Sequence, residues 1–258
     1  TIDSITEIGL AGRGQVVLGP LEIGVGIGWQ KSRPFKSTLT VTAPFGDFNV
    51  FGEALLSIGS ERTFIERAEG GTYTLNTYDE KPFFSATAGG MYRNADAHLN
   101  VMAQYYFNHQ GYADPGIISE FYRNALEGIE TVQTQPLSVT QEQLSAMSNF
   151  EDISAEDLHN PGRHYTGLSV SWYDIADSGV GLSGFWMGGF SDLSGRMTAT
   201  LSYNVTDYIS IRGSAHIAYG EEKDEFIGVK AGDRYISFMN PYGRLGFTIS
   251  ATLGSGSF

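Results

Sequence analysis

The chain has 258 residues, including 33 glycines, 16 phenylalanines and 14 tyrosines, and it contains no cysteine. Its 16 Lys and Arg residues and 29 Asp and Glu residues give a net charge of −13, which argues against a nucleic-acid partner. The lack of cysteine excludes disulfide scaffolds and thiolate metal sites. No apolar run reaches the roughly 18 residues that a membrane helix needs, so we expect membrane insertion only through β-strands.

Most of the chain alternates between apolar and polar residues, a pattern typical of strands with two unlike faces. In the pair formed by residues 196–219, for example, Leu201 and Ile211 lie on the apolar face and Arg212 on the polar one. The strand at 180–190 is apolar on both sides, so its inward side cannot be assigned. The pattern predicts about eleven strands, at residues 8–18, 21–29, 35–43, 48–58, 84–92, 97–107, 168–172, 180–190, 196–205, 209–219 and 245–253.

The segment 111–163 breaks the alternation and is predicted to be partly helical. Asp114 before Pro115 is typical of a helix start, and Thr140 with Gln143 predicts a capping box. Long structured insertions in compact domains are often lids or binding elements. We therefore expect one β-domain over residues 1–258, with 111–163 as a long, partly helical extracellular loop.

The connections between the predicted strands alternate between short and long, and aromatic residues such as Trp29 and Trp172 lie near strand ends. A soluble antiparallel sheet is the alternative, but it gives no reason for loops to be sorted by length. With the terminal Phe258, these features resemble the outer-membrane β-barrel proteins of Gram-negative bacteria, a porin-like class, over nearly the whole chain; no specific family is matched. The resemblance implies a transmembrane antiparallel up-and-down β-barrel of 11–12 strands in the bacterial outer membrane.

An odd count is unusual for such a protein, since single-chain bacterial barrels have an even number of strands. Either one strand is missing from the prediction, or the chain is the C-terminal part of a larger barrel.

Polar residues of the alternating strands are expected to face the lumen. These lumen-lining candidates are Glu7, Arg13, Glu22, Lys36, Glu53, His98, Asn100, Gln104, Arg196, Arg212 and His216. They suggest an outer-membrane channel for the passive passage of small polar solutes, gated or constricted by the 111–163 loop through Ile117, Ile118 and Phe121. The alternative is a non-conducting barrel that anchors or docks other proteins or surface components through its extracellular loops, with the same three residues as an exposed docking patch.

Enzymatic activity is not expected from the sequence. Ser214 and His216 share the inward face of one strand, but no third group that would orient them is evident nearby. We predict no cofactor and no metal site. The expected partners are outer-membrane lipid, lipopolysaccharide and small polar solutes, with a homo-oligomer or a protein partner as a further possibility.

Overall fold

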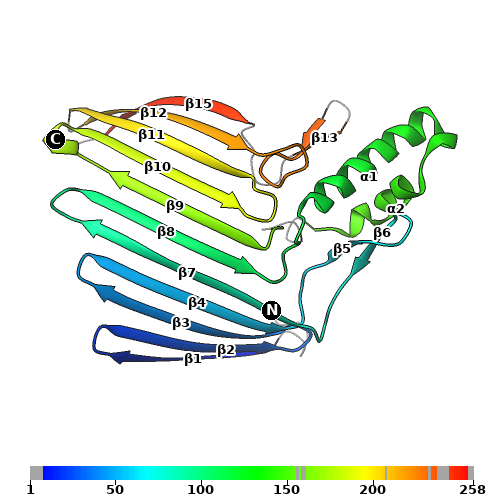
Figure 1. The fold of residues 1–258 in the computed structure, drawn as a ribbon, viewed down its shortest axis with the longest axis horizontal. Helices are drawn as coiled ribbons and strands as arrows, with labels where there is room; N and C mark the ends of the chain where they lie inside the picture. The colour runs from blue at the N-terminus through cyan, green and yellow to red at the C-terminus, as the bar shows by residue number, and fades with distance from the viewer. Residues whose placement is uncertain are drawn as a thin grey trace.

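The computed structural model describes residues 8–154, 157, 161–206, 208–231, 234–236 and 244–254. Its main element is a sheet of eleven strands, each antiparallel to its neighbours (Figure 1). In spatial order the strands are β1 (Gly9–Leu18), β2 (Leu21–Gln30), β3 (Phe35–Phe45), β4 (Phe48–Ile58), β7 (Pro82–Asn94), β8 (Leu99–Asn108), β9 (His164–Trp172), β10 (Val180–Gly189), β11 (Gly195–Thr206), β12 (Ile209–Tyr219) and β15 (Leu245–Leu253). Each of them corresponds to one strand predicted from alternation.

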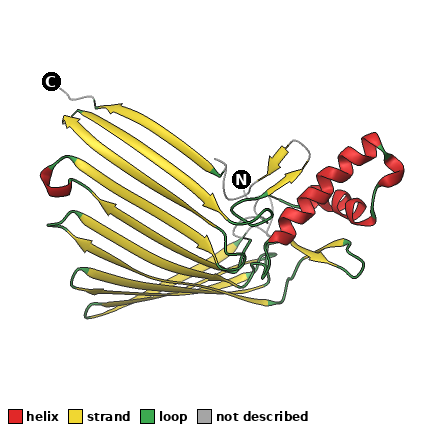
Figure 2. Ribbon diagram, turned by 45° about the horizontal axis from the view of Figure 1, so that its top comes forward, coloured by secondary structure: helices red, strands yellow, loops and turns green. Residues whose placement is uncertain are grey.

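The sheet is curved into an open trough (Figure 2). Among the described residues, β1 and β15 form its two edges and do not pair with each other. The predicted antiparallel all-β class is therefore confirmed, whereas closure into a barrel is not shown. Because eleven successive strands alternate in direction, β1 and β15 run the same way, and direct pairing between them would be parallel.

The outer, convex face of the sheet carries apolar side chains that remain exposed. Val25 lies opposite Leu39 in the register of β2 and β3, and the Leu39 side chain is 45% exposed. Leu201 on β11 faces the same way and is 57% exposed. Strands of 9 to 13 residues are as long as those that cross a bilayer.

A helical module lies at one end of the strands, on the side of the long connections (Figure 1). It consists of α1 (Gly116–Thr134), α2 (Gln141–Asn149), the short helices η2 (Pro136–Ser138) and η3 (Phe150–Asp152), and the hairpin of β5 (Phe64–Arg67) and β6 (Tyr73–Asn76). The predicted capping box of Thr140 and Gln143 is present at the start of α2. The short helix η4 (Ile175–Asp177) and the hairpin of β13 (Val229–Ala231) and β14 (Arg234–Ile236) complete the fold.

The residues predicted to form a gate or a docking patch lie neither in the mouth of the sheet nor on an exposed surface. Ile118 and Phe121 are 1% and 0% exposed and form the core of the helical module with residues of β5, β6 and α2, and Ile117 packs against that core. Helix α1 is amphipathic, and its apolar side packs against the β5–β6 hairpin, for which the sequence shows no strand alternation. In the described part of the chain, no helix is both long and apolar enough to cross a membrane.

Candidate functional site

The strand register places most of the predicted lumen residues on the inner face of the sheet but spreads them across its width. Those on this face are Arg13, Glu22, Lys36, Glu53, Asn100, Gln104, Arg196, Arg212 and His216. His98 instead lies in the turn before β8, with a φ of 51° and its ring stacked on Tyr173 at 5.1 Å. Glu7 is outside the described residues. The fold does not gather these groups into one site.

An apolar cavity of about 420 Å³ lies on the inner face between β7 and β10. The register brings its lining together, because Met102 on β8 lies opposite Ser169 on β9, which lies opposite Phe185 on β10. One row along, Gln104, Gly167 and Met187 are paired in the same way. The structure thus assigns Phe185 and Met187 to the inner face, which the sequence leaves open.

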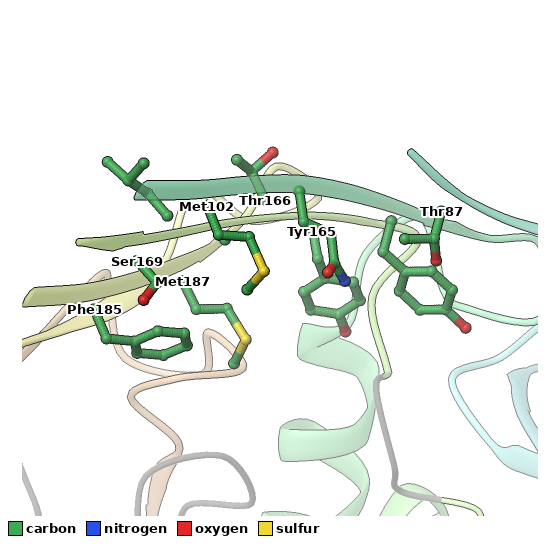
Figure 3. A pocket seen from close by; sticks show the side chains of 11 residues that line it. Thr87, Met102, Tyr165, Thr166, Ser169, Phe185 and Met187 are labelled. Atoms are coloured by element: carbon green, nitrogen blue, oxygen red, sulfur yellow. The ribbon is translucent and has the colours of Figure 1, made fainter. Parts of the chain in front are cut away.

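Figure 3 shows Met102, Phe185, Met187 and Tyr165 on one side of the sheet and Thr166 on the other. Gly167 is at the middle of this lining, and a Cβ added there would meet only the Trp186 carbonyl oxygen, at 3.9 Å. The missing side chain therefore leaves room between Gln104 and Met187. Because most of the side chains that line this cavity are apolar, we call it the apolar cavity.

Tyr165 connects the apolar cavity to a loop beyond the strands. Its ring lines the cavity and stacks near Tyr106 at 6.2 Å between centroids. The Gly162 N–H donates to its hydroxyl at 2.6 Å, and the hydroxyl donates to the Glu225 carboxylate at 2.7 and 2.8 Å. Glu225 is 3% exposed, and burial, together with repulsion from Asp192, raises its pKa to about 8.

A second, polar cavity of about 290 Å³ lies next to the first, and Tyr106 lines both. We call it the polar cavity. Arg62, which is 8% exposed, belongs to its lining. The Arg62 Nη1 donates to the Gln110 carbonyl at 3.2 Å, but its Nε and Nη2 are buried without a hydrogen-bond partner in the described part of the chain.

The aromatic rings of Phe64 and Tyr112 flank the Arg62 guanidinium, with centroids 5.7 and 5.1 Å away. Burial lowers the pKa of Arg62, and nearby acidic groups, Asp157 and Glu225 among them, oppose the shift. Since the ordinary pKa of arginine is far above neutrality, the group stays charged. The two cavities together form an amphipathic hollow, in which the Arg62 guanidinium is not fully hydrogen-bonded.

The sequence predicts parts of this site but not the site itself. Alternation places Met102, Gln104 and Tyr106 on the inward face, yet only Gln104 is polar enough to be chosen as a lumen residue. Arg62 lies in a stretch without period-two alternation and gives no local signal. Its surroundings include Gln110 and Tyr112, which are distant in sequence. Across the described residues, no cluster of three or more potential metal ligands is found.

No family model matches the chain, and no curated protein matches it in sequence. Several solved structures resemble it. The outer-membrane expressed OmpT of Vibrio cholerae is 12% identical, with 94% of this chain and 64% of that chain covered and a TM-score of 0.43. Outer membrane phospholipase A of Escherichia coli is 10% identical, with 95% and 82% covered and a TM-score of 0.35. The phospholipase dimer of Salmonella typhi with bound calcium has 10% identity, 95% and 77% coverage and a TM-score of 0.34.

The chain spans 57 to 64% of the length of the OmpT structures, which is less than two thirds. All of these similar structures are bacterial outer-membrane proteins, so the predicted resemblance to that class is confirmed. At such low identity the likeness concerns the fold alone.

Two predictions of function are corrected at this point. The sequence predicts a passive channel for polar solutes, or a docking barrel, and no enzymatic activity; the similar structures include outer membrane phospholipase A, which is an enzyme. The structure adds a physical reason against the gated channel, because the residues chosen as its gate are buried in the core of the helical module. We therefore retain neither the channel or docking prediction nor the prediction that the chain lacks enzymatic activity.

Proposed function

We propose that this chain is a bacterial outer-membrane protein that binds an amphipathic, lipid-like molecule against the inner face of its sheet. The observation that carries the proposal is the apolar cavity, which interrupts a face that is otherwise mostly polar. Ligand pockets of a few hundred Å³ are typically apolar, with a small number of polar groups that set orientation. Met102 and Met187 have flexible, polarizable side chains that adapt to an acyl chain.

The outer face supports the membrane part of the proposal. Soluble monomers rarely expose a continuous apolar patch larger than a few hundred Å², whereas here apolar side chains such as Leu39 and Leu201 stay exposed on strand after strand. Lipid satisfies such a surface. A bilayer does not tolerate unpaired strand edges, so we also propose that the edges of β1 and β15 are paired in the membrane and that the sheet closes into a barrel.

The binding proposal is tested by photo-cross-linking in bilayers. The refolded protein is placed in lipid nanodiscs with a fatty-acyl probe that carries a diazirine near the end of its chain, and the labelled peptides are mapped by mass spectrometry. We expect labels on inward residues of β8 and β10, such as Met102 and Met187. Labels confined to outward residues away from the cavity, such as Leu39, would show only contact with the surrounding lipid.

A matched pair of glycines gives the control. Gly167→Leu places a side chain in the apolar cavity, and Gly184→Leu places the same side chain on the outer face of the next strand. Both positions have similar space, since an added Cβ meets only a carbonyl oxygen at 3.9 Å. Inward labelling should fall about tenfold or more, equivalent to about 1.4 kcal/mol, in Gly167→Leu alone. Equal labelling in the two variants would contradict the proposal.

A further inference from the structure

The structure also indicates the chemical class of the polar end of this ligand. Arg62 lines the polar cavity, is more than nine-tenths buried, and has two guanidinium nitrogens without a hydrogen-bond partner in the described part of the chain. We propose that Arg62 binds the oxyanion of an amphiphile, a carboxylate or a phosphate, whose chain lies in the apolar cavity. This inference rests on the proposed function and deepens it.

Other charged groups of the polar cavity are already satisfied. Lys36 Nζ lies 2.9 Å from the Glu61 carboxylate, which also pairs with Arg33 at 3.5 Å. Asp157 accepts hydrogen bonds from the Thr63 N–H at 2.7 Å and from the N–H and hydroxyl of Ser154 at 2.9 and 2.7 Å. Within the part of the chain that the structure describes, no carboxylate lies within ion-pair distance of Arg62. Arg62 is therefore the charged group of the polar cavity whose hydrogen-bond donors are not fully used.

A buried cation with unused donors is costly, and an oxyanion is the ligand that offsets this cost. The guanidinium presents its donors in a planar fork, which suits the two oxygens of a carboxylate or phosphate. Neutral head groups lack the charge that the site requires. The chemistry of Arg62 thus selects an anionic head group over a neutral one.

The position of Tyr106 joins the head-group site to the tail site. Its side chain lines both cavities, and Glu53, Thr87, Tyr106 and Tyr165 follow one another across the inner face in the strand register. An amphiphile with its oxyanion at Arg62 therefore passes Tyr106 and enters the space beside Met102 and Met187. A single-chain amphiphile matches this path, because one apolar cavity adjoins one polar cavity.

The test compares three diazirine probes with the same acyl chain and different head groups: a carboxylate, a phosphate and an alcohol. The mole fraction of probe that gives half-maximal inward labelling is measured in nanodiscs of zwitterionic lipid. For the wild-type protein, we expect the better anionic probe to need a mole fraction about tenfold to a hundredfold lower than the alcohol, because hydrogen bonds to charged groups have that strength. The order of carboxylate and phosphate distinguishes a fatty acid from a phosphate-bearing lipid.

Variants locate the effect at one residue. In Arg62→Gln the preference for anionic probes should be lost, and in Arg62→Lys it should be partly retained. The control is Lys31→Gln, which removes an exposed cation that does not line the polar cavity and should leave the preference unchanged.

The comparison of head groups in the wild-type protein needs no variant, so the inference stays testable if Arg62→Gln does not fold. Equal labelling by the alcohol and the anionic probes, with Gly167→Leu still abolishing it, would overturn the role of Arg62 and leave the apolar binding site standing. Inward labelling by none of the probes would overturn both.

Discussion

Tyr165 is the residue at which the sheet, the apolar cavity and the neighbouring loop meet. Its ring packs in the cavity lining. Its hydroxyl donates a hydrogen bond to the Glu225 carboxyl group and accepts one from the Gly162 N–H. The Glu225 N–H in turn donates to Asp192 at 2.7 Å. The carboxyl of Glu225 is therefore fixed by hydrogen bonds in a place where its charged form is poorly solvated, and the stability of this junction depends on pH.

The direction of that dependence follows from the pKa of Glu225, which is about 8 in the folded protein against an ordinary 4.5. The folded protein keeps a proton that the unfolded chain releases between these values, so this stabilisation is full below about pH 4.5 and is lost as the pH rises to about 8. The shift corresponds to a contribution on the order of a few kcal/mol. We expect the free energy of unfolding, measured by urea titration in vesicles, to fall over this range in the wild type and to change much less in Glu225→Gln.

The control for this measurement is Glu222→Gln, which alters an exposed carboxylate of the same loop. This variant should keep the wild-type slope. If Glu225→Gln and the wild type showed the same dependence on pH, Glu225 would not be the group that titrates.

At the scale of elements, the helical module is a small folded unit with its own core. Tyr73 on β6 packs edge-on against Phe121 on α1, with ring centroids 5.3 Å apart, and its N–H donates to Ser145 on α2 at 3.0 Å. Lys223 of the 221–228 loop pairs with Glu120 on α1 at 2.6 Å. The module is thus tied to the long connections and has a hydrophobic core separate from the sheet.

Phe121→Ala tests this separation. Removing a fully buried phenylalanine costs about 3–5 kcal/mol, and we expect that loss to loosen the helical module while the sheet stays folded. Limited proteolysis should then cleave within 111–163 at protease concentrations that leave the wild type intact. The folded sheet should still resist heating, as judged by the mobility of the folded protein on gels, which should not change. Loss of that mobility in Phe121→Ala would show that the module and the sheet fold as one unit.

The elements differ in how well the sequence predicts them. Strands with two unlike faces follow a local rule, so the period-two pattern of residues 196–219 is enough to find β11 and β12. The capping box at Thr140 is likewise local. The β5–β6 hairpin is not, because its short strands acquire an apolar environment only through distant segments. Ile65 and Tyr73 join the core of the helical module, and Phe64 stacks on Phe83 of β7.

The candidate site is harder to predict for the same reason. Phe185 and Met187 belong to a strand that is apolar on both sides, and only pairing with β9 assigns their direction. Arg62 is one cation among several in a loop, and its importance comes from burial and unused donors that depend on distant residues.

For the whole molecule, the central feature is a curved sheet with an apolar convex face and a mostly polar concave face that contains the apolar cavity. This asymmetry is the one expected of strands that face lipid on one side and a polar interior on the other. The two faces should therefore respond differently to the same charge.

Leu39→Arg and Thr38→Arg introduce the same side chain on the outer and inner faces at neighbouring positions of β3. Arginine on a lipid-facing strand near the middle of the bilayer costs about 2–4 kcal/mol, so we expect that loss for Leu39→Arg. Thr38 lies opposite Gly26 in the register, which leaves space on the inner face, and its substitution should cost little. Reversible unfolding in phosphatidylcholine vesicles measures both; equal losses would contradict the assignment of the two faces.

Binding of an amphiphile in the apolar cavity is tested most directly by native mass spectrometry of the protein released from outer-membrane vesicles. We predict that the wild type and Gly184→Leu retain one amphiphile per chain as a discrete mass adduct, and that Gly167→Leu does not. If all three carried the same adducts, or none carried any, the apolar cavity would not be a specific binding site and the central claim would be wrong.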